Sequence, residues 1–312
     1  MSLDFSVFLP TGFAQEFTAG ADPAAAYRQI TDVAQAADEL GFHTLYVPDH
    51  LHTIPPSQGL LFEAWSVIAA LARDTHRVRL GQLVTANSYR NPALQAKIAS
   101  TIDVISNGRL TFGIGSGWYE PDYLGYGYDF GTAGDRLRRL DEAVQVIRAF
   151  WTEDEVTFNG KYYRTAGGIN QPKGIQQPHI PLLIAGGGEK VTLRIAAQYA
   201  DACNIIESPE MLEHKYDILR KHCADVGRDY STIRRTATTA YILGTTDEEA
   251  RSHIPPGSEF AYPGNLASYG LIGTPETIHQ RIAAYEAAGV QELVIGFRHA
   301  PHLTQFAAEF MN

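Results

Sequence analysis

Short runs of apolar residues alternate with longer amphipathic segments along almost the whole chain, and this alternation limits the possible folds more than any other feature. The runs have the length of buried strands. The segments between them carry apolar residues at helical spacing, as at Ile30, Val33, Ala34, Ala37 and Leu40. Strands that alternate strictly with helices predict a parallel sheet with right-handed crossovers.

Eight strand–helix units can be followed in order. The expected strands are Leu3–Leu9, Thr44–Val47, Val78–Thr85, Arg109–Ile114, Leu182–Ala185, Ala202–Ile206, Thr236–Leu243 and Glu292–Phe297. The expected helices are Pro23–Leu40, Phe62–Ala72, Pro92–Ser106, Asp135–Trp151, Val191–Tyr199, Pro209–Val226, Pro275–Gly289 and His302–Met311. Eight units in 312 residues favour an α/β fold of the closed (β/α)8 type, the TIM barrel, over an open doubly wound sheet.

Two segments interrupt this repeat, and no shift in composition marks a linker between domains. Residues 154–181 contain an Asn-Gly pair between β-prone residues, which is typical of a hairpin. Residues 253–273 are irregular and rich in proline and glycine. We therefore expect one domain over residues 1–312, with an insertion at about 154–181 and a variable lid at about 253–273.

Composition excludes several classes of protein. Hydrophobic residues make up 45% of the chain and charged residues 19%, which is ordinary for a globular protein. The net charge of −10 disfavours nucleic acid as the main partner. The only cysteines, Cys203 and Cys223, form no C-x-x-C pair, and neither a signal peptide nor a membrane-spanning run is visible. We expect a cytoplasmic protein with no membrane partner.

Candidate catalytic residues follow the second strand, because the active site of such a barrel lies at the carboxyl ends of the strands. Asp49 and His50 stand there and could act as a general acid and base. The alternative is a capping Asp beside a surface His, which we favour for His52 but not for His50. The ends of strands four, five and six offer no further ligand set, so no metal is expected.

Three other strand ends carry residues suited to a ligand. After strand three, Thr85, Asn87 and Ser88 could hydrogen-bond the polar edge of a ring system. After strand four, glycines at 113, 115 and 117 could allow close approach to a ligand, and Trp118-Tyr119 could stack on it. The alternative for these glycines is tight packing inside the barrel.

The third strand end is glycine-rich. Gly186, Gly187 and Gly188 feed a helix, where free amide groups suit a phosphate, although a plain tight turn would also use glycine. Glu63 is interpreted as a first-turn glutamate favoured by the helix dipole. Gly115-Ser116-Gly117 lacks the G-x-S-x-G pattern of serine hydrolases.

Taken together, these segments resemble the luciferase-like monooxygenase superfamily, and within it the coenzyme F420-dependent oxidoreductases. The resemblance covers about residues 3 to 230. The stretches that carry it are Asp38–Phe42, Val47–His50, Val78–Gly81, Tyr89–Leu94, Asp103–Leu110, Gly113–Glu120, Pro178–Gly188 and Ala200–Asn204.

The resemblance implies a deazaflavin, coenzyme F420, or alternatively FMN, bound at the strand ends. It implies an irregular, often cis non-prolyl bulge at about Gln82-Leu83-Val84 behind the central ring, with the phosphate at the three glycines and His50 near the reactive carbon. The residues expected to bind the cofactor are Leu83, Val84, Thr85, Asn87, Gly115, Ser116, Gly117, Trp118, Gly186, Gly187 and Gly188. Related sugar-phosphate dehydrogenases carry Glu at the position of Trp118 and Trp at that of Ile54, so glucose 6-phosphate is not the expected substrate.

The expected activity is hydride transfer between deazaflavin C5 and a small organic substrate with an electron-poor double bond or an alcohol/carbonyl group. His50, oriented by Asp49, would move the accompanying proton, and Phe260, Tyr262 and Tyr269 would form an aromatic lid. Three alternatives remain open: an FMN-dependent monooxygenase, a non-catalytic flavin-binding protein, and a metal-dependent hydrolase that uses Asp49, His50 and His52. Relatives are mostly dimers, so a homodimer is expected.

Overall fold

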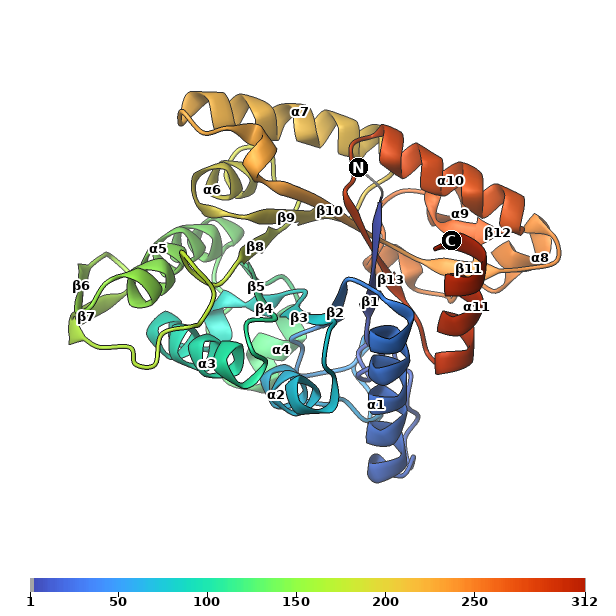
Figure 1. The fold of residues 1–312 in the computed structure, drawn as a ribbon, viewed down its shortest axis with the longest axis horizontal. Coiled ribbons are helices and arrows are strands. Elements are labelled where there is room, and N and C mark those ends of the chain that lie inside the picture. Colours follow the sequence, from blue (N-terminus) through green and yellow to red (C-terminus); the bar gives the residue numbers. More distant parts are fainter. Residues whose placement is uncertain (1–2, 312) are drawn as a thin grey trace.

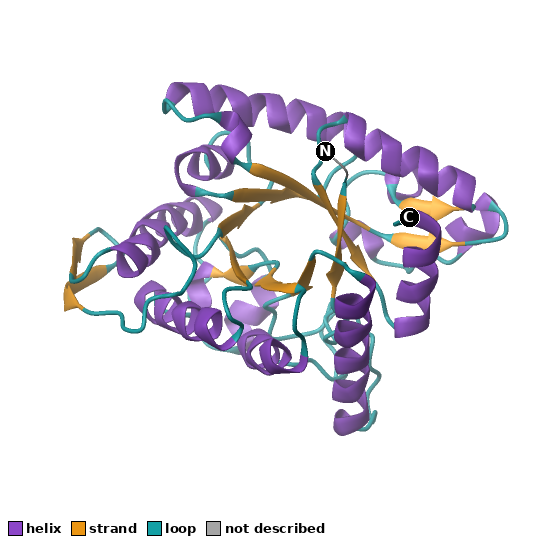
Figure 2. Cartoon of the chain, viewed as in Figure 1, coloured by secondary structure: helices purple, strands orange, loops and turns teal. Residues whose placement is uncertain are grey.

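The computed structural model describes residues 3–311, and its centre is a closed ring of eight parallel strand positions. Helices cover the outside of this ring (Figures 1 and 2). The ring consists of β1 (Asp4–Phe8), β2 (Thr44–Val47), β3 (Arg79–Gln82) with β4 (Thr85–Ala86), β5 (Leu110–Gly115), β8 (Leu182–Ala185), β9 (Ala202–Ile205), β10 (Arg234–Thr239) and β13 (Glu292–Gly296). It closes because β3 and β4 both pair with β5. The expected single-domain (β/α)8 barrel is confirmed.

The eight predicted helices are all present, and the first of them has the predicted bounds. The helix α1 spans Pro23–Leu40, with Asp22 accepting hydrogen bonds from its first turn and Gly41 ending it at a φ of 84°. The others are α2 (Ala64–Asp74), α3 (Pro92–Ile105), α4 (Glu120–Gly125), α5 (Ala133–Thr152), α6 (Thr192–Tyr199), α7 (Pro209–Asp225), α8 (Asp247–Ser252), α9 (Leu266–Tyr269), α10 (Pro275–Ala287) and α11 (Ala300–Phe310). Of these, α2, α5 and α11 begin and end at slightly different residues from those predicted. Short 3₁₀ turns are η1 (Asn87–Tyr89), η2 (Tyr230–Thr232) and η3 (Ser258–Phe260).

The third strand is irregular at the expected place. The peptide bond between Leu83 and Val84 is cis, and it separates β3 from β4. The neighbouring strand β5 accommodates this bulge through Gly113, because a Cβ there would lie 1.9 Å from the carbonyl oxygen of Gln82. The bulge predicted from the resemblance is therefore confirmed.

The insertion after α5 contains the expected hairpin. Its strands β6 (Val156–Asn159) and β7 (Arg164–Gly168) pair antiparallel and project from the barrel beside α5 (Figure 1). Glu142 of α5 accepts hydrogen bonds from the backbone N–H groups of residues 161 to 163, which attach the turn of the hairpin to this helix.

The seventh predicted strand, Thr236–Leu243, is wrong in its second half. The barrel strand β10 ends at Thr239, and β11 (Tyr241–Leu243) leaves the ring to pair with β12 (Leu271–Gly273). Tyr241 turns outward because its ring packs on Phe297 and Phe306, with ring centroids 5.5 and 5.0 Å away. Together with α8 and α9, this pair forms a small layer outside the barrel near α11 (Figure 1).

The helix α4 was not predicted, although it follows directly on the glycine-rich end of β5. It supplies the buried carboxylate described below. Within residues 3–311, none of the helices combines the length and the apolar character that a membrane crossing needs.

Candidate active site

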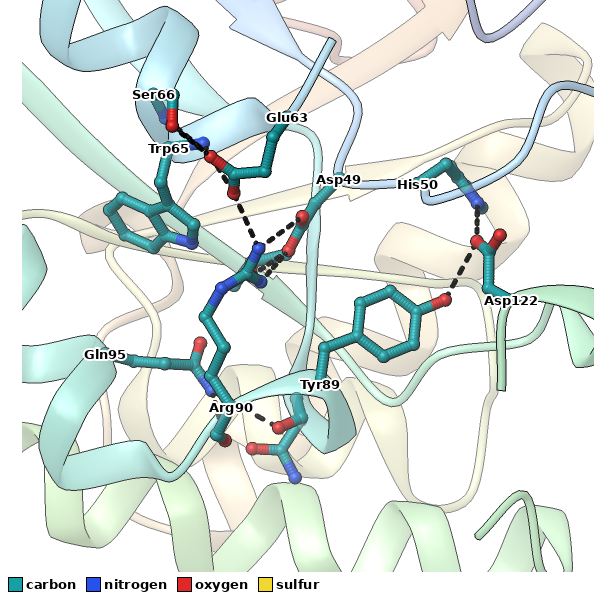
Figure 3. Close-up of polar contacts among 11 residues, drawn as sticks. Asp49, His50, Glu63, Trp65, Ser66, Tyr89, Arg90, Gln95 and Asp122 are labelled. Carbon is teal, nitrogen blue, oxygen red and sulfur yellow. Dashed lines mark hydrogen bonds and ion pairs between the residues drawn. The ribbon is translucent and has the colours of Figure 1, made fainter. Parts of the chain in front are cut away.

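The carboxyl ends of β2, β4 and β5 bring three polar side chains together that lie far apart in the sequence. His50 follows β2, Tyr89 belongs to η1 after β4, and Asp122 lies in α4 after β5. Figure 3 shows the imidazole of His50 and the phenol of Tyr89 directed at the carboxylate of Asp122. Parallel strands place their ends at one rim, so this convergence follows from the fold.

Asp122 is the hub of this cluster and is fully buried. Its Oδ2 lies 2.7 Å from Nδ1 of His50 and accepts a hydrogen bond from the Tyr89 hydroxyl at 3.0 Å. Its Oδ1 lies 3.0 Å from Nδ1 of His52. Burial alone raises the pKa of Asp122, but the hydrogen bond and charge of His50, the backbone N–H of Leu51 and the hydrogen bond of His52 lower it below its ordinary value. Asp122 is therefore ionised, and its carboxylate oxygens accept hydrogen bonds but donate none.

The ring of His50 is fixed on several sides. Its Nδ1 donates to Asp122, which leaves Nε2 as the nitrogen that can exchange a proton with a substrate. Phe13 stacks on the imidazole with ring centroids 4.2 Å apart, and Trp118 and Tyr119 meet it edge-on at 5.8 and 5.6 Å. A histidine oriented by a carboxylate and enclosed by aromatic rings is suited to general acid–base chemistry.

The expected orientation of His50 by Asp49 is wrong. The Asp49 carboxylate points to the opposite side, where it pairs with Arg90 at 2.6 and 3.0 Å and accepts a hydrogen bond from Thr85 (Figure 3). Successive residues at a strand end point in opposite directions, so Asp49 faces α2 while His50 faces α4. Among the described residues, the carboxylate that orients His50 is Asp122.

Arg90 also explains Glu63. The guanidinium donates to Glu63 at 2.8 Å, and the same carboxylate caps α2 by accepting from the backbone of Trp65 and Ser66. Glu63 is thus an N-cap rather than a first-turn residue, and its role is structural. The row Asp49–Arg90–Glu63 attaches the end of β2 to the start of α2.

The floor of the barrel mouth is apolar. Half-buried side chains of Phe8, Leu83, Val84 and Ala185 pack on a buried group inside the barrel that includes Tyr46 and Leu183. A flat, largely apolar ring system could rest on this surface. Leu83 and Val84 belong to this surface, and their contact with a cofactor stays a prediction.

The glycines after strand four have structural causes. A Cβ at position 115 would lie 2.9 Å from Val84, and one at position 117 would lie 1.9 Å from the Tyr123 hydroxyl. Gly117 also has a φ of +79°. These glycines are needed by the protein's own packing, and their roles toward a ligand remain predictions. Ser116 is half-buried and Trp118 is 52% exposed, so both are accessible at the mouth.

Thr85 and Asn87 are buried and engaged with protein groups. Thr85 donates to Asp49, and the amide nitrogen of Asn87 donates to the Tyr163 hydroxyl at 3.1 Å. The amide oxygen of Asn87 has no hydrogen-bond partner among the described residues and stays available as an acceptor. While the Thr85 hydroxyl donates to Asp49, it can serve a ligand only as an acceptor.

The turn Gly186–Gly188 can receive a phosphate only in part. The N–H of Gly186 donates to the carbonyl of Asn204 at 3.0 Å, so the free amides of the turn start at Gly187. Sequence reasoning missed Lys215 of α7. Its Cε would lie 3.8 Å from a Cβ at Gly187, and its ammonium pairs with Glu189 at 2.6 Å. This lysine places a positive charge beside the turn.

A cavity of about 970 Å³ lies next to His50, between the loops after β1, β10 and β13. Phe13 lines this cavity and stacks on His50, which is not itself among the lining residues, so Phe13 stands between the cavity and the imidazole. Phe260 and Tyr262 of the predicted lid line it too. Tyr269 does not, because it is buried and donates to the carbonyl of Pro263 at 2.8 Å. The volume suits a small organic molecule.

No group of three or more His, Cys, Asp or Glu side chains within residues 3–311 is arranged to hold a metal ion. His50 and His52 share Asp122, while Asp49 faces away from both. The arrangement that a hydrolase using Asp49, His50 and His52 would need is therefore not formed.

Fold and site together define a barrel protein with a buried Asp122–His50 pair and an apolar surface at the mouth. The family model for luciferase-like monooxygenase matches residues 3–267, and the chain belongs to this family. It is 27% identical to the FMNH(2)-dependent dimethylsulfone monooxygenase of Pseudomonas putida, over 87% of this chain and 82% of that one. It is 32% identical to the F420-dependent glucose-6-phosphate dehydrogenase of Nocardia farcinica, over 72% and 67% respectively.

A solved structure shows the same fold. An F420-dependent secondary alcohol dehydrogenase, in complex with an F420-acetone adduct, superposes with a TM-score of 0.81 at 19% identity. The match covers 100% of this chain and 99% of that chain. Relatives of this chain thus use either F420 or FMN, and members of the family are oxidoreductases or monooxygenases.

Proposed function

We propose that the protein is an F420-dependent oxidoreductase that transfers hydride between the deazaflavin and a small organic substrate. The observation that carries the proposal is His50, whose Nδ1 is held by the buried Asp122 carboxylate while its ring stacks on Phe13, a residue that lines the cavity. Relatives that bind F420 support the choice of cofactor. The substrate class is an electron-poor C=C, C=O or C=N bond, or the corresponding alcohol.

The ring system of the cofactor would rest on the apolar surface formed by Phe8, Leu83, Val84 and Ala185. Its phosphate would be held by the turn that starts at Gly187, together with Lys215. When bound, coenzyme F420 supplies a hydride at its C5. Nε2 of His50 would give a proton to the substrate atom that becomes basic, or take one in the reverse direction. The rings around His50 leave 13% of its side chain exposed and so would limit the access of water to the imidazole.

We do not propose glucose 6-phosphate as the substrate. The relative from Nocardia farcinica acts on it by name, but the related sugar-phosphate dehydrogenases carry Glu and Trp where this chain has Trp118 and Ile54. Here Trp118 stands edge-on to His50, and Ile54 lines the cavity. These apolar side chains favour a less polar substrate.

A titration with coenzyme F420 and with FMN tests the proposal, followed by a panel of one conjugated enone, one ketone with its secondary alcohol, and one imine. We expect tighter binding of F420 and hydride transfer to at least one member. His50→Gln should bind F420 equally well and transfer hydride roughly 10²–10⁴-fold more slowly. Full turnover in this variant would remove His50 from the mechanism.

The second candidate is an FMN-dependent monooxygenase, favoured by the similarity to the dimethylsulfone monooxygenase over most of the chain. Binding of FMN but not F420, with oxygen consumption when reduced FMN is supplied, would replace our proposal by this one. Cofactor binding without any transfer would indicate a non-catalytic flavin-binding protein.

We also propose a cytoplasmic homodimer, as the resemblance to mostly dimeric relatives implies. Sedimentation should then give a mass twice the 34.3 kDa of one chain. A mass equal to that of the single chain would exclude the dimer.

A further inference from the structure

His52 lies on the same carboxylate as His50, although the proposed chemistry gives it no role. Nδ1 of His52 is 3.0 Å from Oδ1 of Asp122, and Nδ1 of His50 is 2.7 Å from Oδ2. Because the Asp122 carboxylate only accepts, both imidazoles donate Nδ1–H to it. The two rings therefore occupy opposite oxygens of one buried group.

The ring of His52 is held in this position by α4 itself. A Cβ at Gly125 would lie 2.4 Å from Cε1 of His52 and 3.0 Å from its Nε2, so a larger residue there would displace the ring. Tyr126 meets the ring edge-on, with centroids 5.5 Å apart. The His52 side chain is 31% exposed, whereas that of His50 is 13% exposed, so His52 is the more accessible of the two.

The charges around the pair are few. Asp122 supplies one negative charge, the phenols of Tyr89 and Tyr119 face it, and Asp49 is neutralised by Arg90 on the other side of the strand end. One carboxylate compensates one imidazolium, so a proton on either histidine opposes a proton on the other.

We propose that His52 is a positioning residue for His50: it holds the Asp122 carboxylate by Oδ1 and leaves Oδ2 for His50. The inference rests on the proposed function in one respect, which is that His50 transfers the proton. The geometry of the two rings on one carboxylate can be tested without any cofactor.

The test is proton NMR of the cofactor-free protein, in which the His50 signals are assigned by their loss in His50→Gln. The His52→Asn variant keeps an N–H donor near Oδ1. We expect the downfield Nδ1–H signal of His50 to persist in this variant.

Two further variants separate positioning from folding. His52→Ala removes the donor, so the downfield His50 signal should broaden or vanish. Gly125→Ala retains both histidine residues but displaces the His52 ring. It should broaden the His50 signal as His52→Ala does, but to a smaller extent. Thermal melting identifies any variant that fails to fold. If His52→Ala does not fold, Gly125→Ala still tests the inference.

The result that would overturn the inference is a downfield His50 signal that keeps its position and linewidth in both His52→Ala and Gly125→Ala. If the NMR changes occur but no cofactor supports turnover, the proposed function fails and the pairing stands. If hydride transfer occurs, His52→Ala should lower kcat about tenfold and His52→Asn should restore most of it, with KM unchanged in both.

Discussion

The Asp122 carboxylate decides which nitrogen of His50 is free. A carboxylate accepts but does not donate, so Nδ1 of His50 must carry its proton toward Asp122, and Nε2 remains for chemistry. The same carboxylate stabilises the imidazolium that forms when Nε2 takes up a proton. A single buried charge thus fixes the tautomer, the ring orientation and the energy of the protonated state.

Replacing this charge tests the assignment. We expect Asp122→Asn to lower the rate of hydride transfer by ~10²–10⁴-fold, because an amide neither fixes the tautomer nor stabilises imidazolium. The measurement is single-turnover decay of the reduced cofactor's absorbance. Affinity for the cofactor should change little.

Asp49→Asn is the matched control, since Asp49 pairs with Arg90 rather than His50. Its effect should fall on the free energy of unfolding, by about 3 kcal/mol or more, because it leaves a half-buried guanidinium with one partner fewer. If Asp49→Asn instead lost turnover as strongly as Asp122→Asn while remaining folded, the assignment of Asp122 rather than Asp49 as the partner of His50 would be wrong.

The position of His50 at a strand end was enough to select it from the sequence, whereas Asp122 was missed. The two residues are 72 positions apart, and Glu120-Pro121-Asp122 looks like an acidic first turn of a helix. The available signal for Asp122 was its place directly before Tyr123 in an aromatic stretch, which indicates burial. The pairing of Asp122 with His50 could not be predicted, because nothing in the local sequence indicates that α4 folds over the end of β2.

At the level of elements, the bulge in the third strand and the small residues of β5 depend on one another. Gly113 lies against the carbonyl of Gln82 and 3.1 Å from the Val84 side chain if a Cβ is added. Backbone cannot yield as a flexible side chain can. The site's floor at Leu83 and Val84 therefore needs glycine on the neighbouring strand.

Gly113→Ala should lower the free energy of unfolding by roughly 3 kcal/mol or prevent folding, because the added methyl overlaps backbone. Gly296→Ala is the control, since a Cβ at this other strand end meets nothing within 4 Å. Its effect should stay within about 0.5 kcal/mol. Urea unfolding measures both, and equal stability of the two variants would contradict the packing argument.

Element boundaries were predictable where local chemistry sets them and not where tertiary contacts do. Asp22 and Gly41 mark the two ends of α1, and the helix occupies the predicted residues. Tyr241 continues an apolar run after β10, so the sequence favoured one long strand. The Tyr241 ring instead packs on Phe306 of α11 and on Phe297, which directly follows β13, and a local pattern cannot indicate such long-range contacts.

On the scale of the whole molecule, the eight repeats predicted a barrel, and its closure depends on side chains at the amino ends of the strands. Glu292 of β13 accepts from the Ser6 hydroxyl of β1 at 2.6 Å and pairs with Arg234 of β10 at 2.7 Å. His43, directly before β2, lies 3.6 Å from the same carboxylate. This group joins strands from both ends of the chain, opposite to the candidate active site.

The stability of this closure should depend on acid. Burial alone raises the pKa of Glu292, but the hydrogen bond and charge of His43, the charge of Arg234 and the Ser6 hydroxyl outweigh it and lower the pKa to about 2. A lowered pKa in the folded state means that the unfolded chain takes up the proton first as pH falls. The stabilisation is therefore present above about pH 4.5 and is lost as pH falls toward 2.

We expect the wild type to exceed Glu292→Gln in free energy of unfolding at neutral pH, and the difference to shrink by roughly 3 kcal/mol between pH 5 and pH 2. Urea unfolding at a series of pH values measures it. Glu213→Gln, exposed on α7, should show no such trend. If the difference in free energy of unfolding between wild type and Glu292→Gln stayed constant down to pH 2, the charges of His43 and Arg234 would not stabilise the Glu292 carboxylate. Apolar packing alone would then hold these strands together.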